Sequence, residues 1–372
     1  MKILFVNPFY KPYLGGIERV IEKLGAEYLK LGYEVAVLTT KYSFPYEYHG
    51  NWLGVVREVG VVRDVNIYRL ESGPQRAPRF YQAPLVWFSP LEIRKIVNEF
   101  MPDIVIFMGD KWFCGNFWVR IFTPKSRHIW SVVWHDLSWK KLWLKAINYV
   151  FGKMVDQVVV ATNLEKEKVR LAYGIVNSHL KVVPWGVEKT VKLNPKVTKD
   201  YLQILCVGRL SHHKGQHWLV NRFIEASPEF KQPVKLWLIG QAEDSTFDEI
   251  KELVKGRSDV EAILTASDEE LEKFYGESDI FALFPEYESF GLVFLEAQSY
   301  GLPVLTHKVG AIGEVLVESA VITEAYDKAS ATQELVKLVN DREYREEYAK
   351  RSQEHFRSSL SWNDVARKFL EI

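Results

Sequence analysis

The chain has 372 residues, which predicts two domains because a single globular domain usually contains roughly 100 to 200 residues. Hydrophobic residues make up 47% and charged residues 26% of the chain, which excludes a disordered or collagen-like protein. Lys plus Arg and Asp plus Glu number 48 each, so no overall positive field would hold the protein on a nucleic acid. Any electrostatic site must therefore be local.

The cellular location is predicted from the cysteines and from the apolar segments. Cys114 and Cys206 lie far apart in a chain that opens with MKILFVNPFY. This opening has the pattern of a buried strand and lacks the basic n-region and long apolar h-region of a signal peptide. No apolar run approaches the roughly 18 to 20 residues that span a bilayer. We expect a reduced, cytoplasmic protein, with attachment to the cytoplasmic face of the membrane as the alternative.

The first half of the chain alternates short runs rich in Val and Ile with amphipathic stretches of helix length. This alternation predicts a parallel β-sheet covered by helices, the α/β class. The loop YKPYLGG follows the first strand and leads into a helix at 17–31, whereas 41–90 is irregular and is expected to form loops. The strands predicted in this half are 2–7, 34–39, 103–108, 129–134, 157–161 and 181–184.

The second half opens in the same way, because a strand at 203–207 leads into the loop GRLSHHKG and a helix from about Gln216. The chain is therefore predicted to contain two tandem, doubly wound, Rossmann-like domains. The segment 184–199 has two prolines, many lysines and no hydrophobic periodicity, and it places the boundary between domains 1–190 and 191–355. Ligands bind beyond the carboxyl ends of such strands, so we expect both sets of loops to face one cleft. The strands predicted in this half are 203–207, 234–239, 279–284 and 303–306.

The loop GRLSHHKG places Arg209 and Lys214 between the end of a strand and the start of a helix. Free backbone N–H groups and the helix dipole favour an anion there, and two fixed cations would suit a diphosphate. A solvated basic turn is the alternative interpretation. The adjacent His212 and His213 do not indicate a metal, because neighbouring histidines rarely converge on one ion.

A second motif, PEYESFGLVFLEAQSYGLPV, places Glu288 and Glu296 eight residues apart around Phe290 and Gly291. Gly301 and Pro303 end the predicted helix, so Glu288 precedes this helix and Glu296 lies about one turn or more inside it. Both carboxylates can then face one ligand whose phosphates meet the helix N-terminus, and a carboxylate binds vicinal hydroxyls well. Two surface glutamates are the alternative, although surface positions would not need the apolar run around Leu292.

Together these motifs resemble the retaining glycosyltransferases of family 4, which have the two-domain GT-B fold. The resemblance rests on GRLxxxKG and on E-x7-E in its PExxESFGLVxLEAxxxGxPV frame, and extends to YLGGIERV, WHD and the terminal LSWNDVARKFLE. It covers essentially the whole chain. It implies transfer of a hexosyl group from a UDP- or GDP-sugar to a hydroxyl of a glycan or a lipid-linked acceptor. It also implies that a C-terminal helix at 356–372 packs back on the first domain.

The resemblance assigns roles to individual positions. Arg209 and Lys214 match the pair that binds the donor diphosphate, Glu296 matches the glutamate that binds the ribose, and Glu288 the one that contacts the donor sugar. His135 matches a histidine near the reacting face of the sugar. The predicted catalytic residues are His135, Glu288, Arg209 and Lys214. The predicted donor-binding residues are Gly15, Gly16, Arg209, Lys214, Glu288, Phe290, Gly291, Leu292 and Glu296.

No cofactor or metal is expected, because the chain lacks the D-x-D motif of metal-clamped glycosyltransferases. Arg209, Lys214 and the helix beginning near Gly291 would instead stabilise the leaving diphosphate. Two departures from the family pattern, Ala242 after Gly240-Gln241 and Ala311 after Gly310, leave the base and the sugar open.

The acceptor side is the least defined by the sequence. From Lys111 to Val155 the chain has eight Lys or Arg residues and a single acidic residue, interleaved with six tryptophans. The segment from Trp139 to Lys153 has the composition of an interfacial helix on an anionic bilayer. The pattern favours a domain helix with a solvated basic face, because lysines often snorkel beside buried Trp. The irregular region also contains Arg57, Arg63, Arg69, Arg76 and Arg79. Contact with a phosphate on a lipid-linked acceptor is one interpretation, and ordinary surface arginines are the simpler one.

Two other functions fit the same fold: a nucleotide-sugar epimerase or phosphorylase, and a nucleotide-sugar binding protein without turnover. The full pairing of GRLSHHKG with E-x7-E argues against the first, and the intact Arg209, Lys214 and Glu288 argue against the second. An NAD dehydrogenase is excluded, because neither half has G-x-G-x-x-G after a strand.

Overall fold

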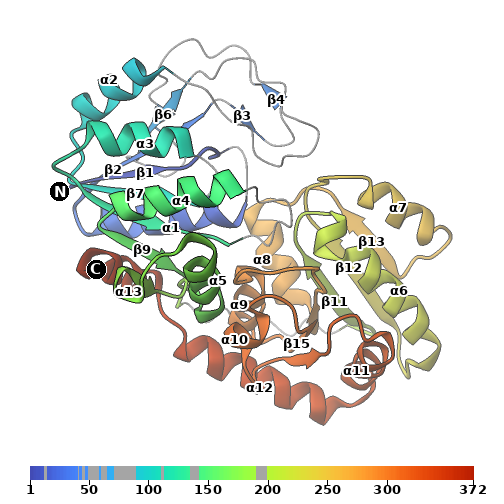
Figure 1. Ribbon diagram of the computed structural model, residues 1–372. Helices are drawn as coiled ribbons and strands as arrows, with labels where there is room; N and C mark the ends of the chain where they lie inside the picture. The colour runs from blue at the N-terminus through green and yellow to red at the C-terminus, as the bar shows by residue number, and fades with distance from the viewer. Residues whose placement is uncertain are drawn as a thin grey trace. The chain divides into compact units, whose positions relative to one another are not determined.

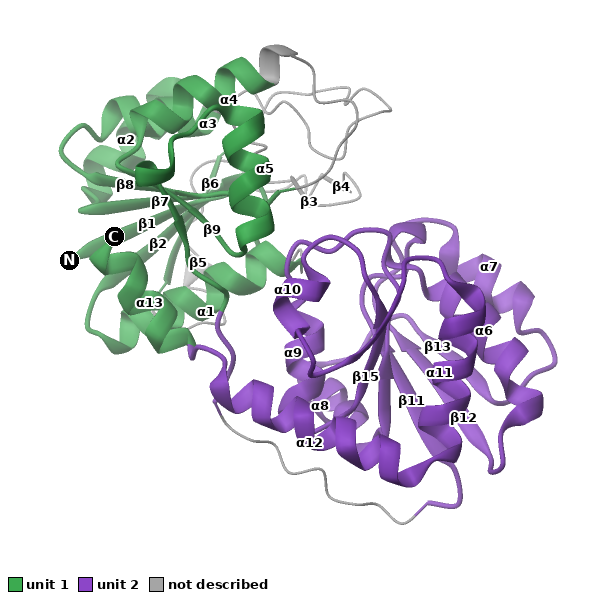
Figure 2. Ribbon diagram, turned by 60° about the horizontal axis from the view of Figure 1, so that its bottom comes forward, with its two compact units in different colours: residues 1–185, 362–372 green, residues 186–361 purple. Residues whose placement is uncertain are grey.

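A computed structural model of the chain describes residues 1–11, 15–40, 65–70, 89–109, 113–134, 142–189 and 199–372, together with three two-residue strands. The chain divides into two compact units (Figure 2): unit 1 contains Met1–Trp185 and Trp362–Ile372, and unit 2 contains Gly186–Ser361. Each unit has its own parallel sheet covered by helices, so the predicted pair of Rossmann-like α/β domains is confirmed.

Unit 1 is built on an eight-stranded sheet in the order β10-β9-β8-β7-β1-β2-β6-β5. All its pairings are parallel except that of β5, and β3 pairs only with β4. The strands are β1 (Lys2–Val6), β2 (Glu34–Thr40), β3 (Tyr42–Ser43), β4 (Glu47–Tyr48), β5 (Glu58–Val59), β6 (Val65–Leu70), β7 (Ile104–Met108), β8 (Arg127–Ser131), β9 (Gln157–Val160) and β10 (Leu180–Val182).

Helices cover both faces of this sheet. The crossovers place α2 to α5 on one face, and α1 and α13 pack together on the other (Figures 1 and 2). The last helix of the chain is therefore part of unit 1. The helices are α1 (Gly16–Lys30), α2 (Pro90–Phe100), α3 (Phe113–Phe122), α4 (Leu142–Met154), α5 (Asn163–Tyr173), the short 3-10 helix η1 (Asn177–His179) and α13 (Trp362–Glu371).

Unit 2 contains a six-stranded parallel sheet in the order β13-β12-β11-β14-β15-β16. In Figure 2, α6, α7 and α11 lie on one face, and α8, α9 and α12 lie on the other. The strands are β11 (Leu202–Val207), β12 (Val234–Ile239), β13 (Val260–Ile263), β14 (Ile280–Ala282), β15 (Val304–His307) and β16 (Val321–Thr323). The helices are η2 (His212–Lys214), α6 (Gln216–Ala226), η3 (Ser227–Glu229), α7 (Thr246–Leu253), α8 (Asp268–Glu277), α9 (Leu292–Ser299), α10 (Ile312–Leu316), α11 (Lys328–Asn340) and α12 (Arg342–Ser358).

The central strands owe their positions to apolar runs that are buried on both faces. Ile3, Leu4, Phe5 and Val6 of β1 are each 0% exposed, as is usual for a strand inside a parallel sheet with helices on both sides. Polar residues at the carboxyl end of such a strand therefore reach the edge of the sheet, where the loops lie.

Six strands were not predicted from the sequence: the two-residue strands β3, β4 and β5, and the longer strands β6, β13 and β16. β6 lies within 41–90, which was predicted to be irregular, because Asn66 and Arg69 interrupt its apolar residues. Arg69 is also not the surface residue that we expected, since it is 8% exposed and its guanidinium donates a hydrogen bond to the Lys11 carbonyl. The other arginines of that region lie outside the described residues.

The ends of the two units differ from the boundaries expected at 190 and 355. Gly186 to Lys189 belong to unit 2, where the Lys189 ammonium group donates hydrogen bonds to carbonyl groups at the end of α12. The last helix of unit 1 starts at Trp362, after α12 has ended at Ser358. In the described part of the chain, no helix is long and apolar enough to cross a bilayer.

Candidate functional site

The loop after β11, residues 208–215, is called the basic loop here and carries Arg209 and Lys214. Gly215 ends it with φ +71°, a left-handed conformation that favours glycine. A Cβ at Gly215 would lie 1.8 Å from the Phe284 carbonyl oxygen, so only glycine permits this contact. The backbone N–H of Glu286 donates a hydrogen bond of 2.9 Å to the His213 carbonyl. These contacts hold the basic loop against the loop that follows β14.

The loop after β14, residues 285–291, is called the acidic loop and carries Glu288. It ends at Gly291, the N-cap of α9, with φ +84°. A Cβ at Gly291 would lie 2.5 Å from the Phe294 ring and 3.1 Å from Glu288 Cγ. The predicted helix start near Gly291 is therefore confirmed. Phe290 is 6% exposed, so its side chain contributes mainly to the core.

The basic and acidic loops meet in an ion pair: Lys214 Nζ lies 2.8 Å from Glu288 Oε2. The side chains are 19% and 14% exposed, so the charges are partly withdrawn from solvent and interact more strongly than they would at the surface. The structure thus brings together two of the predicted site residues that are 74 positions apart in the chain.

Arg209 pairs with a residue that the sequence analysis did not identify. Arg209 Nη1 lies 2.7 Å from Oε1 of Glu243, whose side chain is only 10% exposed. Glu243 follows Gly240, which packs closely on the basic loop, since a Cβ there would lie 1.9 Å from the Gly208 carbonyl oxygen. The only sequence signal was the acidic pair Glu243-Asp244 just after a predicted strand.

A third loop, which follows β15 and contains Gly310 and Ala311, supports the acidic loop. The backbone N–H of Ala311 donates a hydrogen bond of 2.9 Å to the Glu288 carbonyl. Gly310 has φ +53°, and a Cβ there would lie 2.1 Å from the same oxygen. The backbone of Glu288 is therefore fixed independently of its ion pair with Lys214.

Glu296 lies on α9 and is half-buried. Its Oε2 accepts a hydrogen bond of 3.3 Å from the hydroxyl of Tyr275, which is 3% exposed on α8. The Tyr275 ring stacks on Tyr300 at a centroid distance of 5.2 Å. Tyr275 was not predicted, and its hydrogen bond orients the carboxylate to which the family resemblance assigns the ribose.

The two adjacent histidines of the basic loop face different partners. His213 Nδ1 lies 3.0 Å from Ser211 Oγ, whereas the His212 ring contacts His217 and its Nε2 lies 3.2 Å from Glu249 Oε1. Burial, followed by the positive charges of Lys214 and Arg209, lowers the pKa of His213 to about 4. Across the described residues, no group of three or more His, Cys, Asp or Glu side chains is arranged to hold a metal ion.

In unit 1, Gly15 and Gly16 begin α1 beyond the end of β1. Gly15 is the N-cap with extended backbone angles, and no described atom lies within 4 Å of a Cβ built on Gly16. Packing among the described residues therefore does not require glycine at position 16. Beside this helix start, the buried Asn7 side chain donates a 3.0 Å hydrogen bond to Oε1 of Glu18, which is 5% exposed.

His135 lies outside the described residues, but the chain leading to it is well anchored. Glu165, 1% exposed on α5, accepts hydrogen bonds of 2.9 Å from the backbone N–H of Trp134 and from that of Ala161. Thr162 caps the same helix by accepting from the Glu165 N–H. The sequence T-x-x-E is the pattern of a capping box and could have revealed this pair.

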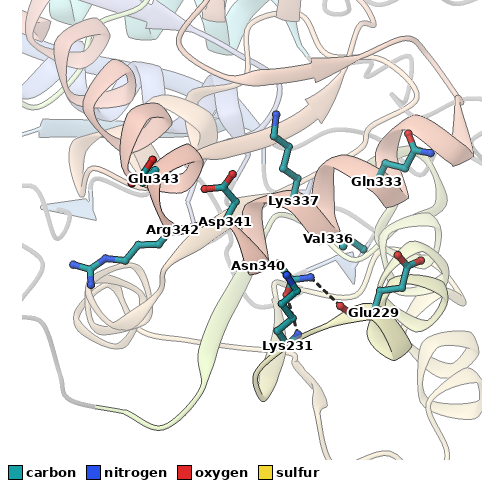
Figure 3. Close-up of a pocket in the computed structure, with 9 residues that line it drawn as sticks. All are labelled: Glu229, Lys231, Gln333, Val336, Lys337, Asn340, Asp341, Arg342 and Glu343. Atoms are coloured by element: carbon teal, nitrogen blue, oxygen red, sulfur yellow. Dashed lines mark hydrogen bonds between the residues drawn. The ribbon is translucent and has the colours of Figure 1, made fainter.

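A pocket of about 470 Å³ lies elsewhere in unit 2 (Figure 3). It adjoins the segment that precedes β12 and the end of α11, at the opposite end of the strands from the basic loop. Asn340 crosses one side, donating to the Glu229 carbonyl and accepting from the Lys231 N–H, each at 2.8 Å. This pocket contains none of the predicted site residues.

Comparison with known proteins gives matches over both halves of the chain. Residues 14–190 match the family model described as Glycosyltransferase Family 4, and residues 189–355 match the model described as Glycosyl transferases group 1. An uncharacterized glycosyltransferase of Methanocaldococcus jannaschii, MJ1607, is 23% identical over 100% of this chain and 97% of its own length. An uncharacterized 41.2 kDa protein of the Klebsiella pneumoniae cps region is 29% identical over 53% of this chain, and this chain spans about half of its length (54%).

Solved structures of low sequence identity share the fold. The Anabaena protein HepE, solved in complex with UDP and glucose, matches with a TM-score of 0.73 and 16% identity over 100% of this chain and 98% of that one. HepE has also been solved in complex with UDP-glucose.

Proposed function

This chain belongs to the family 4 glycosyltransferases with the GT-B fold, and from that premise we propose the following reaction. The enzyme transfers a hexosyl group from a UDP- or GDP-sugar to a hydroxyl of a glycan or lipid-linked acceptor. The anomeric configuration is retained, and no metal ion is required.

One observation carries this proposal: the two cation–carboxylate pairs at the carboxyl ends of the strands of unit 2. Arg209–Glu243 and Lys214–Glu288 hold two positive charges on the basic loop, next to the N-terminus of α9. Backbone N–H groups at a helix start and fixed cations both stabilise phosphate oxygens. This arrangement supports binding of the donor diphosphate without a metal ion.

In the proposed reaction, the bond between the anomeric carbon and the diphosphate oxygen breaks, and its electron pair stays on the leaving diphosphate. Arg209 and Lys214 stabilise the negative charge that grows there, the effect that usually contributes most to catalysis. The acceptor oxygen bonds to the anomeric carbon on the same face and passes its proton to a leaving phosphate oxygen. Retention of configuration follows from this same-face attack.

The remaining site residues are assigned to the donor's other groups. Glu296, oriented by Tyr275, is placed at the vicinal hydroxyls of the ribose, and Glu288 at the transferred sugar. Gly15 and Gly16 would let the start of α1 approach the diphosphate, and His135 is placed at the reacting face of the sugar. The HepE complex with UDP-glucose supports a UDP-sugar as the first donor to try.

We propose that the exposed face of α4 contacts the lipid surface that carries the acceptor. Lys145, Tyr149, Val150 and Lys153 are exposed there, and Lys153 Nζ lies 4.3 Å from the centroid of the Tyr149 ring. The helical segments 113–122 and 142–154 contain no Asp or Glu. A face that combines cations with apolar side chains suits an anionic lipid surface, and this supports a lipid-linked acceptor.

The membrane contact can be tested by co-sedimentation with lipid vesicles at low salt. We expect the protein to bind vesicles containing anionic lipid but not neutral vesicles, and Lys145→Glu/Lys153→Glu to lose that binding. Equal behaviour with both kinds of vesicle would end the membrane proposal without affecting the donor site.

The transfer reaction itself is tested by incubating the protein with UDP-, GDP- and ADP-sugars and a panel of candidate acceptors. Proton NMR of the anomeric signal reports the donor used and the stereochemistry together. We expect a product of retained configuration, formed only with acceptor and also after treatment with EDTA. Conversion of the donor without acceptor would instead indicate an epimerase or a hydrolase, and loss of activity with EDTA would contradict the metal-free mechanism.

A further inference from the structure

In the proposed diphosphate site, the charges of the two cations are balanced by the carboxylates with which they pair. Arg209 is paired with Glu243 and Lys214 with Glu288, so two positive charges face two negative ones. Asp244 adds another carboxylate close by, since its Oδ2 accepts the His212 N–H at 3.0 Å. The diphosphate of a nucleotide sugar brings two further negative charges into this cluster, and a new positive charge would stabilise it there.

The group best placed to supply that charge is the imidazole of His213, between Arg209 and Lys214 in the basic loop. Its Nδ1 lies 3.0 Å from Ser211 Oγ, and its Nε2 lies 3.9 Å from Glu243 Oε2. Glu243 Oε2 is buried and, among the described residues, accepts no hydrogen bond. A doubly protonated imidazole has a donor for each of these oxygens.

Charged groups face His213 from each neighbouring loop. Arg209 and Lys214 belong to its own loop, Glu243 and Asp244 to the loop after β12, and Glu288 to the acidic loop. Without ligand, burial and then the two cations lower the pKa of His213 to about 4, so the ring is neutral near pH 7. A diphosphate bound to those cations offsets their repulsion and adds attraction, which favours the protonated ring.

We propose that binding of a nucleotide sugar at the basic loop is coupled to the uptake of a proton from solvent by His213. This inference rests on the proposed function, and it makes His213 a positioning residue that adjusts the charge of the site. The protonated ring would donate from Nδ1 to Ser211 and from Nε2 toward Glu243, and would keep Arg209 available for phosphate oxygens. Binding and protonation strengthen each other, because such coupling is reciprocal.

The test is isothermal titration calorimetry of the full chain with UDP-glucose, GDP-mannose and ADP-glucose near pH 7. Their diphosphates are esterified at both ends and do not titrate near neutrality. Any proton taken up on binding is therefore bound by the protein. Titrations in buffers of low and high ionisation enthalpy give the number of protons. His213→Gln removes the titrating group, and His212→Gln is the matched control in the adjacent position.

For the wild-type protein and for His212→Gln we expect uptake of up to one proton, and a Kd that rises by as much as tenfold per pH unit above pH 7. For His213→Gln we expect binding without uptake and with a much flatter pH dependence. Wild-type binding with no uptake, or equal uptake by His213→Gln, would overturn the coupling alone. Absence of binding by every nucleotide sugar would overturn the proposed function and the coupling with it.

Discussion

The two units have similar parallel sheets, but the carboxylates near the ends of their strands have different partners. In unit 2, Glu243 and Glu288 pair with the cations of the basic loop. In unit 1, Glu165 accepts backbone N–H groups, and Glu18 accepts from the buried Asn7 side chain. Carboxylates that neutralise cations can respond to a charged ligand, whereas carboxylates that accept hydrogen bonds from buried amide groups hold the surrounding chain in place. We therefore expect substitutions of these carboxylates to affect activity in unit 2 and stability in unit 1.

The largest effect on stability is expected from Glu165→Ala. This change leaves two buried backbone N–H groups without their acceptor, at a cost of about 1–3 kcal/mol each, so we expect unfolding to become easier by roughly 3 kcal/mol. Chemical denaturation measures this change. Glu167→Ala, at an exposed position of the same helix, should stay within about 0.5 kcal/mol of wild type. Equal stability of both variants would remove the anchoring role of Glu165.

The largest effect on turnover is expected from Lys214→Ala. Because Lys214 is proposed to stabilise charge on the leaving diphosphate, its removal should lower kcat by on the order of 100-fold or more. Steady-state kinetics measures this loss, and near-native circular dichroism would show that the fold is intact. Lys231→Ala, in the pocket of Figure 3, is the matched control and should leave kcat unchanged. Unchanged kinetics of Lys214→Ala would contradict its role.

A pH-dependent loss of stability is expected in unit 1. His128 is 0% exposed, and burial, followed by the positive charge of Arg120, lowers its pKa to about 4. Because the unfolded chain binds a proton near pH 6.5 and the folded chain only near pH 4, stability should fall as the pH drops through that window. The loss is on the order of 2 kcal/mol at pH 5. His128→Gln should be less sensitive to pH between 7 and 5, and an unchanged slope of stability against pH would refute this origin.

A smaller effect is expected from Glu296→Ala. A carboxylate hydrogen-bonded to ribose hydroxyls contributes about 1.5 kcal/mol or more, so Kd for the donor should rise at least tenfold. Calorimetry or competition binding measures the change. Glu261→Ala, at an exposed position of β13, is the control. If both variants bind the donor equally well, the ribose contact must lie elsewhere.

Much of this organisation was predictable because it is local in the sequence. Apolar runs predicted the central strands, and Gly291 together with Gly301 predicted where α9 begins and ends. Lys214 and Glu288 were predicted to bind one ligand, although the sequence did not reveal that they contact each other. β6 could not be recognised because buried polar side chains such as Arg69 interrupt its pattern.

The partners of the site residues were harder to predict, because they come from distant parts of the chain. Glu243 meets Arg209 across 34 residues, and Tyr275 meets Glu296 across 21. Nothing in the local pattern distinguishes Glu243 from a solvated acidic residue, and Tyr275 has the spacing of an ordinary core residue. Only the folded arrangement of loops brings these side chains to the site.

The most direct test of the central claim is the binding of nucleoside diphosphates to unit 2. Calorimetric titration of the wild-type protein with UDP and GDP should show binding of at least one of them. Arg209→Gln/Lys214→Gln, with a circular dichroism spectrum like that of wild type, should bind that nucleotide at least 100-fold more weakly. The same affinity in both proteins would contradict the account, because the diphosphate would then be held by other residues.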